Sequence, residues 1–185
     1  PAQAENPTFS PDGAHLAFTQ GGNLWVYCRA TDSGHPLTHD GSASILNGRA
    51  SWVYYEEILG RGSRYRAFWW SPDGQELVFL RSDEHSVPEM TLTFCEGDYG
   101  QVEHQRYPKA GKPNPAVSLW KVGLRKDAHP VMLADGQPDD AYLAFPAWSP
   151  DGQALFWQWM DRNQTDWRLF RLNRNENTPQ VVLEE

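Results

Sequence analysis

The segment Trp70-Ser-Pro-Asp-Gly-Gln-Glu-Leu-Val-Phe79 decides the fold, because two further copies of its pattern occur in the chain. They are Phe9-Ser-Pro-Asp-Gly-Ala-His-Leu-Ala-Phe18 and Trp148-Ser-Pro-Asp-Gly-Gln-Ala-Leu-Phe-Trp157. In each copy an aromatic residue ends one strand, Ser-Pro-Asp-Gly forms a tight turn, and an apolar run begins the next strand. Proline presets φ at the first corner of such a turn, and glycine accepts a positive φ. The repeat therefore predicts three strand–turn–strand units.

A further strand is expected after each copy, at residues 23–27, 117–122 and 167–172. Repeated four-stranded antiparallel units are typical of a β-propeller. The repeat also resembles that of TolB-type and prolyl-oligopeptidase-type propellers. We therefore expect an all-β fold, a partial β-propeller with about three four-stranded antiparallel blades. Since a closed propeller needs at least four blades, we expect the chain to be part of a larger one.

The spacing of the repeat predicts two insertions. The serines at positions 10, 71 and 149 are 61 and 78 residues apart, whereas a blade usually spans roughly 40 to 50 residues. We place blades at about residues 1–41, at 67–81 together with 117–135, and at 140–185. The insertions then lie at about residues 42–66 and 82–116. Insertions in a rigid scaffold are where binding residues tend to be found.

The charge balance argues against nucleic-acid and membrane partners. The chain has 16 lysine and arginine residues against 24 aspartate and glutamate residues, a formal net charge of −8. Binders of nucleic acid or of anionic lipid need clusters of basic residues, and the sequence contains no such cluster. Its apolar runs are also far shorter than the roughly 18 residues of a membrane helix. We expect no nucleic-acid partner and no membrane segment in this chain.

No catalytic motif is visible. The sequence has no Gly-x-Ser-x-Gly nucleophile elbow and no phosphate-binding loop, and Gly60-Arg-Gly62 lacks the third glycine of a dinucleotide loop. The six histidines are scattered and no Cys-x-x-Cys pair occurs, so we expect no metal and no cofactor. For Cys28 and Cys95, isolated buried thiols are favoured over a disulfide. We assign no catalytic residue to this chain.

The first insertion holds the best candidate for a binding site. Ser51 is a suitable N-cap for a short helix that ends before Gly60, and this helix would carry Glu56 and Glu57. Two neighbouring carboxylates repel each other unless a cation lies between them. An α-ammonium, with three N–H donors, is a suitable cation. The alternative is a solvated pair that the dipole at the start of the helix stabilises.

Four segments, in order, resemble the dipeptidyl peptidase IV family of serine exopeptidases. They are Trp52-Val-Tyr-Tyr-Glu-Glu57, Phe68-Trp-Trp-Ser-Pro-Asp-Gly74, Ser82-Asp-Glu-His-Ser-Val-Pro88 and Tyr107-Pro-Lys-Ala-Gly-Lys-Pro-Asn-Pro115. They cover about residues 45–122, and the flanks match only at the level of the propeller repeat. The first segment departs from the family motif in one respect: Tyr55 stands where a third acidic residue is frequent.

The resemblance implies an eight-bladed propeller that caps an α/β-hydrolase domain with a Ser-Asp-His triad, a domain absent from this chain. Family members release X-Pro or X-Ala dipeptides from free N-termini, and two glutamates bind the substrate's α-ammonium. These map onto Glu56 and Glu57. The chain would then recognise and gate substrate, would be inactive alone, and would belong to a periplasmic or secreted peptidase. The arginine with which the family holds a substrate carbonyl is expected upstream and is assigned to no residue here.

The second insertion resembles the arm that family members use for dimerisation, so residues 90–115 are expected to form a homodimer contact. The alternative is a long hairpin packed on its own propeller. For Arg61, Arg64 and Arg66, which follow the glutamates, solvated side chains are favoured over neutralisation of the carboxylates. The alternative function for the whole chain is a TolB-like propeller that binds protein partners and catalyses nothing. A relative with a different cleavage register is a third reading.

Overall fold

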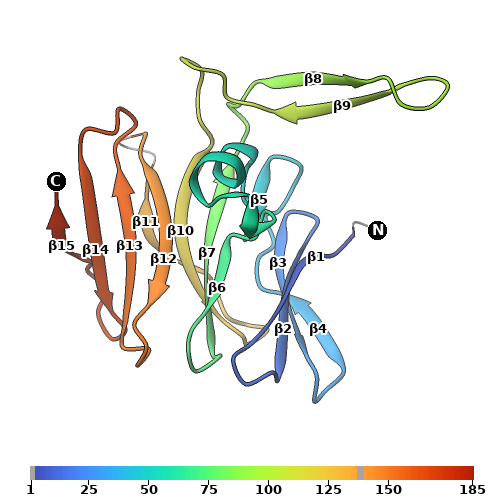
Figure 1. The fold of residues 1–185 in the computed structure, drawn as a ribbon. Helices are drawn as coiled ribbons and strands as arrows, with labels where there is room; N and C mark the ends of the chain where they lie inside the picture. Colours follow the sequence, from blue (N-terminus) through green and yellow to red (C-terminus); the bar gives the residue numbers. More distant parts are fainter. Residues whose placement is uncertain (1–2, 137–139) are drawn as a thin grey trace.

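The computed structural model describes residues 3–136 and 140–185, and in this part of the chain antiparallel β-sheet dominates (Figure 1). Three sheets stand side by side as the blades of a partial propeller. The first blade contains β1 (Glu5–Phe9), β2 (His15–Gln20), β3 (Asn23–Cys28) and β4 (Ser33–Pro36), in that order across the sheet. The third contains β12 (Tyr142–Trp148), β13 (Ala154–Met160), β14 (Trp167–Asn173) and β15 (Gln180–Glu184). The expected all-β class and four-stranded units are confirmed.

The three Ser-Pro-Asp-Gly segments form the same turn. In each, the serine Oγ donates a hydrogen bond of 2.6 Å to the aspartate Oδ1 two residues later. The glycines Gly13, Gly74 and Gly152 have φ values of 69°, 68° and 68°. Glycine adopts this left-handed conformation without steric cost, which explains why the repeat ends in glycine.

The second blade differs because its first strand is split. β7 (Glu76–Asp83), β10 (Ala116–Gly123) and β11 (Val131–Asp135) form three of its strands. The remaining edge of β7 pairs with two short strands, β6 (Phe68–Trp70) near one end and β5 (Ile45–Asn47) near the other. Residues 48–67 therefore leave the blade in the middle of its first strand and return to it. Residues 45–47, which we assigned to the first insertion, lie in the blade itself.

The core lies between the blades. Because side chains alternate along a strand, Leu77 and Phe79 of β7 pack toward the first blade, whereas Val78 and Leu80 pack toward the third. The buried side chains thus form two clusters, one between the first and second blades and one between the second and third. Trp157 is fully buried in the cluster between the second and third blades. Four other tryptophans are partly buried against one of the two clusters: Trp69, Trp70, Trp148 and Trp159.

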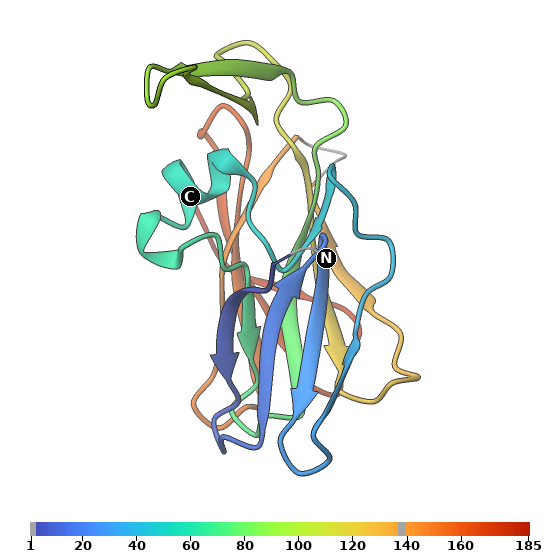
Figure 2. The ribbon, with the colours of Figure 1, turned by 90° about the vertical axis from the view of Figure 1, so that its right-hand side faces the viewer.

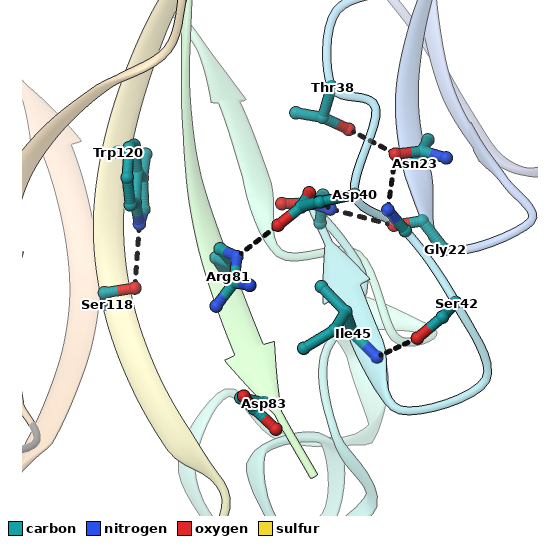
Figure 3. A network of polar contacts seen from close by, with 12 residues as sticks. Gly22, Asn23, Thr38, Asp40, Ser42, Ile45, Arg81, Asp83, Ser118 and Trp120 are labelled. Carbon is teal, nitrogen blue, oxygen red and sulfur yellow. Dashed lines mark hydrogen bonds and ion pairs between the residues drawn. The ribbon is translucent and has the colours of Figure 1, made fainter. Parts of the chain in front are cut away.

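A polar network fixes the connection from the first blade to the second (Figure 3). Asp40 accepts hydrogen bonds from Arg81 Nε at 2.8 Å and from Asn47 Nδ2 at 2.9 Å. Asn23 Oδ1 accepts from Thr38 Oγ1 at 3.0 Å. These residues come from both blades and from the segment that joins them. The network therefore sets the place where β5 begins, and with it the segment that follows β5.

The second insertion forms a separate hairpin of β8 (Glu89–Phe94) and β9 (Gln101–Arg106), which projects sideways beyond the blades (Figures 1 and 2). Most of its residues are exposed, so it is not packed along its own propeller. At its root, Arg106 donates hydrogen bonds of 3.0 Å to the carbonyl oxygens of Glu84 and Val87.

Cys28 and Cys95 are free thiols, but the expectation that they are buried is wrong. Cys95 is exposed because it follows β8 at the outer end of the arm, and Cys28 is half-buried where β3 ends. Within residues 3–136 and 140–185, no group of three or more His, Cys, Asp or Glu side chains could hold a metal ion. No helix among these residues is long and apolar enough to cross a membrane.

Candidate functional site

The segment between β5 and β6 carries both predicted glutamates on a short helix. Residues 52–58 are helical, and Tyr54–Ile58 form the π-helix η1, in which the Leu59 N–H donates to the Tyr54 carbonyl at 2.7 Å. Ser51 Oγ accepts a long hydrogen bond of 3.4 Å from the Tyr54 N–H, in the manner of an N-cap. Single π-helical turns are rare and are frequently found at functional sites.

Aromatic contacts hold this helix in place. The Tyr54 side chain is buried between the second and third blades, and its hydroxyl accepts a hydrogen bond of 3.1 Å from the Leu143 N–H of β12. Burial raises the pKa of Tyr54, so the phenol stays protonated. On the other side, Trp52 packs against Tyr107 at the root of the arm, with ring centroids 4.4 Å apart. The helix is thus fixed to the third blade and to the arm.

Glu56 is largely covered and already has a cationic partner. Its side chain is 14% exposed, and its Oε2 lies 2.5 Å from Nε of Arg61. The Glu56 carboxylate raises the pKa of Arg61. The arginine, at the start of the short helix η2 (Arg61–Ser63), has a 75% exposed side chain. Because the arginine is exposed, solvent screens part of the attraction between the two charges. For Arg61 the prediction of a solvated side chain that does not neutralise a carboxylate is wrong. Arg64 is exposed, and Arg66 is half-buried.

Glu57 differs from its neighbour because it is exposed and lines a cavity of about 480 Å³. In the part of the chain that the structure describes, no side chain forms an ion pair with Glu57. The rest of the lining comes from the glutamate helix and the third blade: Val53, Ile58, Tyr142, Ala144, Phe145, Gln158, Met160, Gln164 and Trp167. An ammonium group beside Glu57 would gain a charge-assisted hydrogen bond. Displacement of Arg61 would then make the Glu56 carboxylate available as a second acceptor.

Phe145 is a further residue at this site, and sequence reasoning missed it. It lies in β12, where the pairing with β13 shifts register between Ala144 and Ala147. Its φ is 51° and its side chain is exposed. A bulky residue at positive φ is a genuine outlier, with a cost of about 1–3 kcal/mol. Such bulges redirect side chains beside functional sites. The one available signal was a proline, Pro146, inside a predicted strand.

The comparisons with known proteins show the family to which the chain belongs. The model of the dipeptidyl peptidase IV (DPP IV) N-terminal region matches residues 1–185. Dipeptidyl aminopeptidase B of Saccharomyces cerevisiae is 29% identical over 184 residues, which cover 96% of this chain and 22% of that protein. Dipeptidyl-aminopeptidase B of Aspergillus niger is 30% identical over 191 residues, which cover 96% of this chain and 21% of that protein.

A solved structure of a dipeptidyl peptidase has the same fold over this region. The crystal structure of Porphyromonas gingivalis dipeptidyl peptidase 4 superposes with a TM-score of 0.85 at 29% sequence identity. The match covers 98% of this chain and 26% of that chain. The chain therefore spans about a fifth of the length of these curated relatives and about a quarter of the solved one.

Proposed function

Because this chain belongs to the dipeptidyl peptidase IV N-terminal region family, we propose that it recognises and gates the substrates of a serine exopeptidase. In this proposal Glu56 and Glu57 bind the α-ammonium of an unblocked peptide, and the parent enzyme releases X-Pro or X-Ala dipeptides. The hydrolase domain that supplies the triad belongs to the same parent chain. The names of the relatives, which are dipeptidyl peptidases and dipeptidyl aminopeptidases, support this reading.

One observation carries the proposal: a helix that interrupts the first strand of a blade presents two adjacent carboxylates of unequal availability. Glu57 is exposed at a cavity, and among the described residues the ion-pair partner of Glu56 is a solvent-exposed arginine. An ion pair that only stabilised the helix would account for Glu56 but not for Glu57 at the cavity. A site that must accept a cation needs carboxylates that are positioned in advance and weakly occupied.

The arm and the location of the protein belong to the same proposal. The hairpin of β8 and β9 exposes Phe94, Tyr99 and Val102, which suits a contact with a second copy of the parent protein. Family membership further favours a periplasmic or secreted location for the parent.

The test uses the full-length parent protein and two substrates, Gly-Pro anilide with a free and with an acetylated N-terminus. We expect cleavage of the free form and little cleavage of the blocked one. Glu57→Gln should lower kcat/KM for the free substrate about ten- to hundredfold, because one charge-assisted hydrogen bond of about 1.5–3 kcal/mol is lost. Glu56→Gln should act in the same direction.

Glu176→Gln is the matched control, since Glu176 is an exposed glutamate in the turn between β14 and β15. Unchanged kcat/KM in both Glu56→Gln and Glu57→Gln would remove the ammonium-binding role. Equal cleavage of the free and blocked substrates would keep a hydrolase but discard the recognition of a free N-terminus. No cleavage of either would favour the non-catalytic binding propeller.

A further inference from the structure

The bulge in β12 places an aromatic ring next to the glutamate helix. β12 is the strand of the third blade whose Leu143 N–H bonds to Tyr54 of that helix. Two residues later, Phe145 leaves the regular strand path, with φ at 51°, and 49% of its surface is exposed. Pro146, beside it, is buried. The bulge therefore turns Phe145 outward, while the strand on either side of it stays packed.

Phe145 lines two cavities. The first, of about 480 Å³, is also lined by Glu57. The second, of about 390 Å³, is lined by Leu59, Arg66 and Trp69 and includes neither glutamate. In any amino acid the ammonium and the side chain are attached to the same Cα. A substrate whose ammonium lies on Glu57 can therefore place its first side chain in the first cavity.

The first cavity has the chemistry of a side-chain pocket. Its apolar lining includes Ile58, Met160 and Trp167, in addition to Phe145. Gln158 and Gln164 are its polar members besides Glu57 and the Tyr142 hydroxyl. Gln164 also adopts a positive φ, 59°, so two of the residues that line this cavity have a backbone conformation rare for L-residues. Strained backbone of this kind clusters at ligand sites.

On the basis of the function proposed above, we propose that Phe145 is a specificity-determining residue. Its ring forms the apolar wall on which the side chain of the substrate's first residue packs. The site then favours unblocked peptides that begin with an apolar side chain, such as leucine, over those that begin with glycine. Phe145 acts on the identity of the first residue, whereas Glu57 acts on the presence of a free ammonium.

The test compares Leu-Pro anilide with Gly-Pro anilide in the full-length parent, since the two substrates share the scissile bond and the leaving group. We expect Phe145→Ala to lower the leucine-to-glycine ratio of kcat/KM about tenfold, the usual effect of apolar side-chain contacts in a pocket. The change should appear as a higher KM for Leu-Pro anilide, with the constants for Gly-Pro anilide within about twofold of wild type. Phe145→Leu, which keeps an apolar wall, should restore most of the ratio.

Phe9→Ala is the matched control, because Phe9 is another exposed phenylalanine, at the end of β1 in the first blade; it should leave the ratio unchanged. Glu57→Gln should lower kcat/KM for both substrates by the same factor. If wild type cleaves both substrates and Phe145→Ala leaves the ratio intact, or lowers both rates equally, this inference is wrong and the proposed function stands. If wild type cleaves neither substrate, both are wrong.

Discussion

Tyr54 should be the residue that holds the glutamate helix in register with the third blade, and its hydroxyl can be tested alone. In Tyr54→Phe the ring still fills the core between the second and third blades, where Tyr54 is 2% exposed. The variant loses only the acceptor of the Leu143 N–H, a bond of 3.1 Å. Leu143 is itself buried, so its amide would lose its partner away from water. Such a loss costs about 1–3 kcal/mol. Because Tyr54→Phe also removes a buried polar hydroxyl, part of this cost is offset, and we expect a net loss of about 1–2 kcal/mol.

Hydrogen exchange at β12 measures this directly. A loss of 1–2 kcal/mol corresponds to roughly 5- to 30-fold faster exchange at the Leu143 amide if exchange follows local opening. In the same variant, kcat/KM for an unblocked substrate should fall several-fold, because the glutamates are less well positioned. Tyr65→Phe is the matched control: Tyr65 stacks on Tyr55 with centroids 3.9 Å apart, a contact of the ring and not of the hydroxyl. Unchanged exchange at Leu143 in Tyr54→Phe, or equal acceleration in Tyr65→Phe, would refute the argument.

Two further predictions concern charges. Arg61→Ala should lower KM for an unblocked substrate up to about fivefold at low salt, because the ammonium no longer competes with the exposed arginine for Glu56. Arg64→Ala is the control. A higher KM in Arg61→Ala would show instead that Arg61 assists binding. Burial raises the pKa of Glu84 to about 7 from an ordinary value of 4.5. The folded state therefore holds the proton of this carboxyl more tightly than the unfolded state does. The resulting stability is fully present below pH 4.5 and is lost as the pH rises through 7, by about 3 kcal/mol at most. The difference in unfolding free energy between Glu84→Gln and wild type should grow in favour of the variant over that range, and a pH-independent difference would contradict the assignment.

The fold class could be predicted from the sequence, because it depends on turns and strands that form through local interactions. Each Ser-Pro-Asp-Gly segment forms its turn from side chains within two residues of one another and from one glycine at positive φ. Such local interactions do not depend on the rest of the chain, which explains why the strand pairs could be predicted. The start of the glutamate helix was predictable for the same reason, because Ser51 bonds to an amide three residues later.

The composition of the site was decided by contacts between residues that are far apart in the chain. Tyr54 meets Leu143 across 89 residues, and Glu57 shares a cavity with Phe145. Neither pairing has a periodic signal, because each depends on how one blade packs against the next. The split of the first strand of the second blade into β5 and β6 is likewise set by pairing with β7. The sequence determined which carboxylates are present, and the packing of blades decided which of them is open and which aromatic ring stands beside it.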